Sequence, residues 1–232
     1  MVAAPPLLVI DPSTSFPETE GLARIAQAWR GEWRVLRPAL SGDGPGHDTP
    51  YDVSAVVVMG SRASVHDDHR WLAQLCDWLR PIVRGSIRLP LLGICFGHQL
   101  IAHLAGGEVD RVAADGRKLL GVADSELERS RLLAAGQLRV VISHCEEVKS
   151  LPSRFHRSSH RAPVRFDGLE HDELPIFGFQ FHPEAGAGFL AARGVSVGEH
   201  DAQTLERDSA RVLEAFASFA RGHAGRHAGA GA

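Results

Sequence analysis

Residues 89–105 read Leu-Pro-Leu-Leu-Gly-Ile-Cys-Phe-Gly-His-Gln-Leu-Ile-Ala-His-Leu-Ala. A short apolar run leads to Cys95, a glycine lies two positions away on each side, and apolar residues at helical spacing follow. This pattern predicts a buried strand, a sharp turn and a helix, with the thiol projecting from the turn. The positive N-terminal end of the helix favours the thiolate, so Cys95 is a candidate nucleophile.

A candidate base lies far downstream, in the segment Ile-Phe-Gly-Phe-Gln-Phe-His-Pro-Glu at residues 176–184. Its alternating aromatic residues predict a strand, which Pro183 ends because proline cannot donate to a strand ladder. His182 then stands at the carboxyl edge of the sheet, where the functional groups of open α/β sheets gather and where Cys95 is also expected. Glu184 is placed to hold one ring nitrogen of His182 while the other faces the thiol. The sequence therefore predicts a catalytic triad of Cys95, His182 and Glu184.

The order of predicted elements favours an α/β fold. In the first half, short apolar runs alternate with amphipathic stretches, which is typical of βαβ units around a parallel sheet. The strands expected there are 7–11, 33–37, 55–60 and 91–95, and the helices are 18–29, 71–84 and 97–105. The second half predicts strands joined by turns, at 119–123, 138–143, 155–158, 163–166 and 176–181. A helix over 204–221 is then expected to cover one face of the sheet.

Together the motifs resemble the class I glutamine amidotransferases, whose signature is a Gly-x-Cys-x-Gly-x-Gln elbow followed far downstream by His-Pro-Glu. The elbow here is Gly93, Cys95, Gly97 and Gln99. The resemblance covers nearly the whole chain and is strongest to stand-alone proteins similar to the amidotransferase domain of GMP synthase. It implies a flavodoxin-like open, mostly parallel sheet flanked by helices, with a small antiparallel extension in the second half.

The resemblance also implies one amidotransferase-like domain over residues 1–222. Residues 223–232 are rich in glycine, alanine and histidine and have nothing to bury, so they are expected to form a disordered tail. Most of the 232 residues should therefore belong to a single globular unit.

The implied reaction is hydrolysis of the side-chain amide of glutamine, or of a related γ-glutamyl amide, through a thioester on Cys95. His182 is implied to protonate the leaving ammonia and then to activate water. The ammonia would pass to a separate acceptor enzyme, such as a synthase subunit, or to solvent. Glutamine or a γ-glutamyl small molecule is thus the expected ligand.

Further residues are assigned by the resemblance alone. The N–H of Phe96 and the loop at Gly60 and Ser61 are implied to form the oxyanion hole. This loop departs from the family pattern, because Ser61 and Arg62 stand where Gly-Pro is usual, and the backbone freedom of the second glycine is lost. The substrate contacts implied by the family are Gln99, Ser143 and His144.

Two alternatives to this interpretation stay open. A thiol α/β-hydrolase would also have a Gly-x-nucleophile-x-Gly elbow, but that fold places the acid between nucleophile and histidine, whereas Glu184 follows His182. A catalytically weak or inactive binding or regulatory protein that kept the fold is the second alternative, and the altered loop at Gly60 supports it.

Composition limits the remaining classes. The chain is 44% hydrophobic and 23% charged with a formal net charge of −3, which favours neither nucleic acid nor an anionic membrane as partner. No run approaches the roughly 20 apolar residues of a membrane helix, and no signal peptide is apparent. Three cysteines in unrelated contexts argue against a disulfide framework, so a cytoplasmic protein is expected.

Two other polar clusters have simpler interpretations. His66-Asp67-Asp68-His69 precedes a predicted helix and is interpreted as a charged N-terminal cap, so neither a metal nor a cofactor is expected. A second cluster is interpreted as a solvated strand edge, with contact to an anion as the alternative. Its members are His156, Arg157, His160, Arg161 and Arg165.

Overall fold

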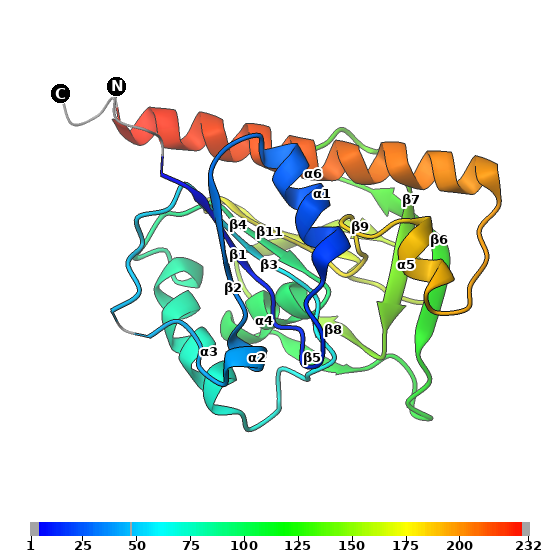
Figure 1. The fold of residues 1–232 in the computed structure, drawn as a ribbon, viewed down its shortest axis with the longest axis horizontal. Coiled ribbons are helices and arrows are strands. Elements are labelled where there is room, and N and C mark those ends of the chain that lie inside the picture. Colours follow the sequence, from blue (N-terminus) through cyan, green and yellow to red (C-terminus); the bar gives the residue numbers. More distant parts are fainter. Residues whose placement is uncertain (1–4, 47, 229–232) are drawn as a thin grey trace.

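A nine-stranded mixed sheet forms the centre of the computed structural model, which describes residues 5–46 and 48–228 (Figure 1). Five of its strands run parallel, in the order β2-β1-β3-β4-β11. They are β1 (Leu7–Ile10), β2 (Trp33–Leu36), β3 (Ala55–Val58), β4 (Leu91–Ile94) and β11 (Ile176–Phe179). The last strand in sequence, β11, thus lies in the middle of the sheet beside β4.

Beyond β11 the sheet continues antiparallel, in the order β10-β9-β6-β7. These strands are β10 (Gly168–His171), β9 (Phe155–His160), β6 (Leu119–Leu127) and β7 (Gly136–His144). A separate antiparallel pair joins β5 (Glu108–Arg111) to β8 (Glu146–Ser150). The predicted fold class, an open and mostly parallel sheet with an antiparallel extension in the second half, is confirmed.

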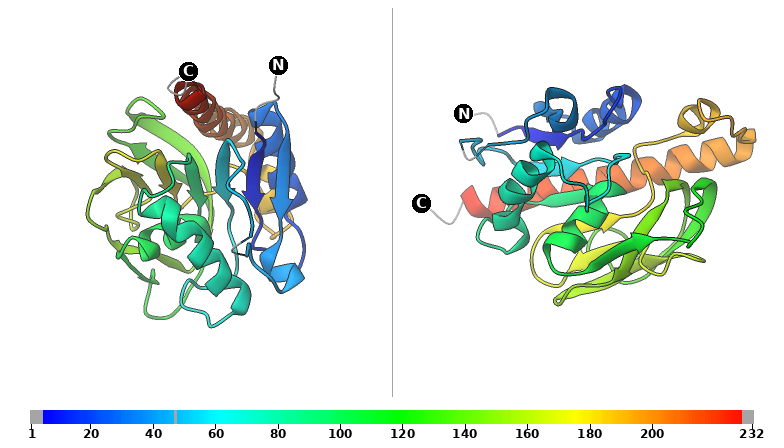
Figure 2. Two further views of the ribbon diagram at one scale, coloured as in Figure 1. Left: turned by 90° about the vertical axis from the view of Figure 1, so that its left-hand side faces the viewer. Right: turned by 90° about the horizontal axis from the view of Figure 1, so that it is seen from below.

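Helices cover both faces of the parallel strands (Figures 1 and 2). One face packs on α1 (Thr19–Trp29) and α6 (Glu199–Ala228), and the other on α3 (Arg70–Val83) and α4 (Phe96–Leu104). Successive strand residues point to opposite faces, so Leu7 joins the α1/α6 core whereas Leu8 joins the α3/α4 core. Two short helices, α2 (Pro38–Ser41) and α5 (Ala187–Ala191), lie in connections.

The predicted strand over 163–166 is wrong. Residues 161–167 form a loop in which the N–H of Arg161 donates to the carbonyl of Val164 at 3.1 Å. Pro163 has no N–H to give to a ladder, and the strand instead begins at Gly168. The final helix is longer than predicted, from Glu199 to Ala228, and residues 229–232 of the predicted tail lie outside the described residues.

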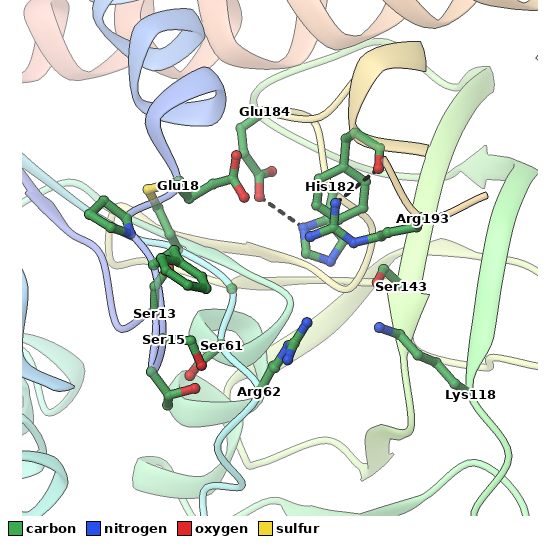
Figure 3. Close-up of a pocket in the computed structure, with 16 residues that line it drawn as sticks. Ser13, Ser15, Glu18, Ser61, Arg62, Lys118, Ser143, His182, Glu184 and Arg193 are labelled. Carbon is green, nitrogen blue, oxygen red and sulfur yellow. Dashed lines mark hydrogen bonds and ion pairs between the residues drawn. The ribbon is translucent and has the colours of Figure 1, made fainter. Parts of the chain in front are cut away.

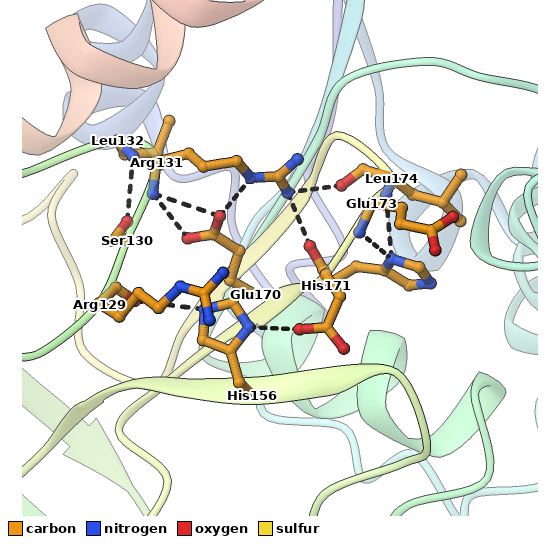
Figure 4. Close-up of polar contacts among 10 residues, drawn as sticks. Arg129, Ser130, Arg131, Leu132, His156, Glu170, His171, Glu173 and Leu174 are labelled. Atoms are coloured by element: carbon orange, nitrogen blue, oxygen red, sulfur yellow. Dashed lines mark hydrogen bonds and ion pairs between the residues drawn. The ribbon is translucent and has the colours of Figure 1, made fainter.

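A polar cluster ties the β6–β7 connection to the turn between β10 and β11 (Figure 4). The side chain of Arg131 is bonded to the carboxylate of Glu170, and its Nη2 donates to the carbonyls of His171 and Leu174, each at 2.7 Å. The guanidinium also lies 5.2 Å from the centre of the Phe177 ring. These contacts use most of the donors of Arg131, so the cluster holds the strands together.

Within the described residues, no helix combines the length and apolar character needed to cross a membrane.

Candidate active site

Cys95 lies at the turn between β4 and α4, and its backbone is unusual. Its φ of 50° and ψ of −101° put a non-glycine residue in a region that side chains rarely adopt. The conformation is held by hydrogen bonds on both sides, from the N–H of Cys95 to Phe179 at 2.8 Å and from the N–H of Gln99 to Cys95 at 3.0 Å. Strain of this kind is typical of functional turns. The predicted strand, turn and helix are therefore confirmed.

The two flanking glycines serve close packing rather than the bend of the turn. Neither Gly93 nor Gly97 has a positive φ, so the sharp bend falls on Cys95 itself. A Cβ on Gly93 would lie 2.5 Å from the carbonyl carbon of Gly97, and one on Gly97 would overlap the carbonyl of Val58. Glycine at both positions thus lets α4 begin directly against β3 and β4.

His182 and Glu184 follow β11 and are both buried. The N–H of His182 donates to the carbonyl of Val141 at 2.9 Å, which fixes the backbone. Its Nδ1 lies 2.8 Å from Oε1 of Glu184, and its ring stacks on Phe189 with centroids 5.5 Å apart. Glu184 in turn lies against α1, where a Cβ on Gly21 would come within 2.7 Å of its Cγ. The imidazole is therefore held in one orientation.

The free side of His182 faces Cys95. A Cβ on Gly60 would lie 2.8 Å from Cε1 of His182 and 3.5 Å from Cβ of Cys95, so the two side chains meet at this glycine. Burial lowers the pKa of His182, but the charges of Glu184 and Cys95, together with the hydrogen bond to Glu184, outweigh it. The pKa therefore lies well above its usual value, which favours the imidazolium beside the sulfur.

The residues implied as oxyanion donors flank the same point. Phe96 is the first residue of α4, where backbone N–H groups have no partner within the helix. Ser61 donates its hydroxyl to the carbonyl of Pro12 at 2.6 Å, which anchors the loop after β3. Among the described residues, the non-glycine residues with positive φ are Arg30, Cys95 and Arg154. Ser61 therefore adopts an ordinary backbone conformation, and the loop has no need of a second glycine.

A cavity of about 300 Å³ opens beside His182 (Figure 3). This volume is at the lower end of the range for small-molecule sites. Five charged residues line it, with Arg62, Lys118 and Arg193 as cations and Glu18 and Glu184 as acids. Its other lining residues are Ser13, Thr14, Ser15, Phe16, Pro17, Met59, Gly60, Ser61, Ser143, His182 and Phe189.

Cys95 is not one of the lining residues. It is 4% exposed and lies behind Gly60 and His182, with its Sγ 4.0 Å from the carbonyl oxygen of Ser143. The thiol is thus adjacent to the cavity floor and nearly closed off from solvent.

The three residues implied as substrate contacts lie in different surroundings. Ser143 lines the cavity, whereas Gln99 and His144 do not. The amide nitrogen of Gln99 and Nδ1 of His144 both donate to the carbonyl of Glu146, each at 2.8 Å. Arg161 donates to Nε2 of His144 at 2.5 Å. Burial and the nearby Arg161 lower the pKa of His144 to about 3, so its ring is neutral.

Two parts of the cavity wall carry no motif in the sequence. The loop at residues 13–18 follows β1 and reaches the site because the carboxyl ends of parallel strands meet at one edge of the sheet. Lys118 precedes β6, in the antiparallel part. The first could have been found from its place after a predicted strand, but no sequence signal marks Lys118. Burial raises the pKa of Glu18, as does the Glu184 charge, against a backbone hydrogen bond at Gly21 and the Arg193 charge.

The other polar clusters are used in internal contacts. In the part of the chain that the structure describes, no group of three or more histidine, cysteine, aspartate or glutamate side chains has the arrangement of a metal site. The predicted basic edge is divided between pairs: His156 bonds Asp172 at 2.8 Å (Figure 4), and Arg157 bonds Glu128. Arg161 is buried with Asp167 at 2.9 Å, so the prediction of a solvated edge is wrong for this residue.

Comparison with known sequences gives a consistent result. The family described as "Glutamine amidotransferase class-I" matches residues 51–191. Over 99 residues the chain is 41% identical to one subunit of the glutamine-hydrolysing GMP synthase of Pyrococcus abyssi, covering 43% of this chain and 53% of that protein. The corresponding subunit from Methanocaldococcus jannaschii is 40% identical over 100 residues, with the same coverage of both. The chain thus spans about half the length of the curated relatives it matches.

Solved structures match over almost the full length. A glutamine amidotransferase from Methylobacillus flagellatus superposes with a TM-score of 0.73 at 19% identity, covering 93% of this chain and 95% of that one. Another from Thermotoga maritima gives a TM-score of 0.71 at 20% identity, covering 93% and 96%. These likenesses establish the fold.

Proposed function

Because the chain belongs to the class I glutamine amidotransferase family, we propose that it hydrolyses the side-chain amide of glutamine, or of a related γ-glutamyl amide, through a thioester on Cys95. Membership of this family sets aside the thiol α/β-hydrolase alternative. The observation that carries the proposal is the imidazole of His182, bonded to Glu184 at 2.8 Å on one side and next to Cys95 on the other. A nucleophile beside an oriented base is the arrangement that acyl transfer requires.

In the proposed reaction, the sulfur of Cys95 attacks the amide carbon while the thiol proton resides on His182. The imidazolium gives this proton to the leaving nitrogen, the C–N bond breaks and ammonia departs. Water then attacks the thioester carbon, with its proton taken by His182 and returned to sulfur as the C–S bond breaks. The products are ammonia and the γ-carboxylate, and the enzyme is unchanged.

The developing oxyanion would be stabilised by the N–H groups of Phe96 and of the Gly60–Ser61 loop. Donors of this type each contribute about 3–4 kcal/mol in comparable sites. The bond from the Ser61 hydroxyl to Pro12 supports this assignment, because it fixes the loop before the substrate arrives. We assign Ser143 to substrate contact, and Gln99 and His144 to holding the backbone at Glu146.

The destination of the ammonia is also a proposal. The curated relatives are subunits of glutamine-hydrolysing GMP synthases, as their names state. We propose that this chain likewise works with a separate synthase subunit, or releases ammonia to solvent, in the reducing cytoplasm that keeps thiols free.

The test is ammonia release from glutamine, measured with the purified protein alone and in the presence of the candidate synthase subunit. The expected result is activity that Cys95→Ala abolishes and Cys145→Ala retains, since Cys145 is an exposed free thiol outside the cavity. A glutamine-like chloroketone should label Cys95, as read by peptide mapping. Labelling of Cys145 instead, or equal activity in the Cys95 variant, would contradict the proposal.

The low exposure of Cys95 favours a second candidate function, a protein that is inactive until a partner binds. This candidate predicts no ammonia release and no chloroketone labelling by the protein alone. Both should appear when the synthase subunit opens the thiol to the cavity. Full activity of the isolated chain would exclude it.

A further inference from the structure

Three basic side chains surround the mouth of the cavity. Arg62 comes from the connection after β3, Lys118 from the residue before β6, and Arg193 from the segment after α5. All three are exposed, and Figure 3 shows their charged ends directed toward the cavity. Segments far apart in the sequence thus place positive charge at one opening.

These three cations outnumber the two acids that share the cavity with them. In the described parts of the chain, none of the three forms an ion pair with a carboxylate. Arg193 is fixed by its own neighbour, since its Nη1 donates to the carbonyl of Phe189 at 2.9 Å and its Cζ lies 3.4 Å from the ring centre. The acids of the cavity wall are Glu18 and Glu184, and Glu184 is already bonded to His182.

Glutamine leaves part of this charge unmatched. The amino acid brings one ammonium group, which Glu18 can accept, and one carboxylate, which one cation can bind. Two cations then remain without a partner at the mouth. Arg62 stands where the family pattern has proline, so this surplus is a feature of the present chain.

From this imbalance we propose that the substrate is a γ-glutamyl amide whose released amine carries a second carboxylate, bound by Arg62 and Lys118. The proposal rests on the proposed function and specifies its substrate class. Figure 3 shows Arg62 and Lys118 approaching from the side opposite Glu184, with Arg193 beside His182. Arg193 and Glu18 accordingly hold the amino-acid end, and the other two cations hold the leaving group.

Two matched substrates test the proposal. γ-Glutamylglycine and γ-glutamylglycinamide differ by a carboxylate against a neutral amide of similar shape. We expect kcat/KM to be at least about tenfold higher for γ-glutamylglycine, in line with charge-assisted hydrogen bonds. The preference should fall as salt rises, because exposed charges are screened.

In the double variant Arg62→Gln/Lys118→Gln, the ratio of the kcat/KM values for the two amides should fall to near the ratio of their uncatalysed hydrolysis rates. Arg88→Gln is the matched control, since Arg88 is an exposed arginine that does not line the cavity. Equal Tm values for the variants would show that folding is unaffected. A ratio that is unchanged in the double variant, or a wild-type ratio near one, overturns the proposal.

Binding measurements separate this proposal from the proposed function. Calorimetry on Cys95→Ala compares the affinities of the two amides without turnover. Tighter binding of γ-glutamylglycine without hydrolysis by the wild type supports the binding of a second carboxylate at Arg62 and Lys118 and contradicts the proposed hydrolysis. Hydrolysis of both amides without any preference supports the hydrolase and overturns the substrate class. If the protein neither binds nor hydrolyses the two amides, both proposals are contradicted.

Discussion

Glu184 contacts His182 through a single hydrogen bond of 2.8 Å in a buried setting, and its charge opposes the effect of burial on the pKa of the imidazole. Glu184→Gln keeps the shape and removes the charge. We expect the pKa of His182 to fall and kcat for glutamine hydrolysis to decrease by about 10²–10⁴-fold, the range for general acid–base groups. NMR titration of the His182 ring and pH–rate profiles measure the two effects.

Glu32→Gln is the control for this substitution, because Glu32 is exposed and lies outside the cavity. It should leave both the titration and kcat as in the wild type. An unchanged His182 titration in Glu184→Gln would show that the carboxylate charge does not set the pKa.

The low pKa of His144 makes the free energy of unfolding depend on pH. Burial, with the Arg161 charge, lowers its pKa in the folded protein to about 3 from the usual 6.5. Between these pH values the His144 imidazole is therefore protonated in the unfolded chain and neutral in the folded protein. The contribution of neutral His144 to the free energy of unfolding is fully present above pH 6.5 and is lost as the pH falls toward 3. His144→Gln, which stays neutral, should reduce the slope of unfolding free energy against pH by roughly 1 kcal/mol per pH unit.

Urea unfolding at several pH values between 4 and 7 measures this slope. His200→Gln is the matched control, because His200 is an exposed histidine in α6. Its curve should run parallel to the wild type. Parallel curves for His144→Gln would refute the assignment of this titration.

Among single residues, the sequence predicts those that lie in recognisable motifs. Cys95, His182 and Glu184 come together because they follow the buried strands β4 and β11, which are neighbours and end at the same edge of the sheet. The orientation of Gln99 and His144 toward the carbonyl of Glu146 depends on β8, whose pairing is not visible in local sequence. Side-chain direction is set by contacts between distant segments, so it could not be predicted.

Among the elements, the start of α4 depends on the absence of two side chains. Gly97→Ala places a methyl group against the carbonyl of Val58 in the neighbouring strand. We expect the unfolding free energy to fall by about 1–3 kcal/mol or more, as for other overpacked sites. The activity should fall with it, because Cys95 would have to move. Chemical denaturation and ammonia release measure the two.

Gly222→Ala is a glycine-to-alanine control in α6. Nothing lies within 4 Å of a Cβ at this position, so we expect stability to be unchanged or to rise by about 0.4–1 kcal/mol. If Gly97→Ala lowers the free energy of unfolding no more than Gly222→Ala does, the contact between β3 and α4 can accommodate a methyl group without cost.

Strands that consist of apolar runs were predictable, whereas two short polar strands, β8 and β10, were not. The parallel strands β1, β3 and β4 are buried along their whole length and consist almost entirely of apolar residues, and each falls within its predicted range. In contrast, β8 reads Glu-Glu-Val-Lys-Ser and β10 reads Gly-Leu-Glu-His, which have no apolar run. Their strand conformation comes from pairing with β5 and with β9 and β11, which is a tertiary effect.

In the whole molecule, α6 connects the two halves (Figure 1). It packs on α1 and forms ion pairs with it, Arg24–Glu206 at 2.7 Å and Arg30–Glu214 at 3.0 Å. Between these two glutamates in sequence, Asp208 accepts a hydrogen bond from the backbone of Arg139 in β7 at 2.9 Å. A single cooperative unit is therefore expected.

Phe216→Ala tests this expectation. The Phe216 ring is buried against Phe177 of β11, so we predict a loss of about 3–5 kcal/mol in unfolding free energy. The transition should stay single, with tryptophan fluorescence and circular dichroism coinciding. Glu214→Gln removes an exposed ion pair on the same helix and should cost less than about 1 kcal/mol. Two separate transitions would show that the halves unfold independently.

The position of β11 has a consequence for synthesis on the ribosome. β4 pairs with β3 early in the chain, but its other edge stays unoccupied until residue 179 has been made. An open apolar strand edge is an aggregation hazard, so we expect a nascent chain without β11 to aggregate more readily than the complete chain. Cys95 is translated long before His182, so a product that is truncated between them holds the thiol without the imidazole that lies beside it in the folded protein.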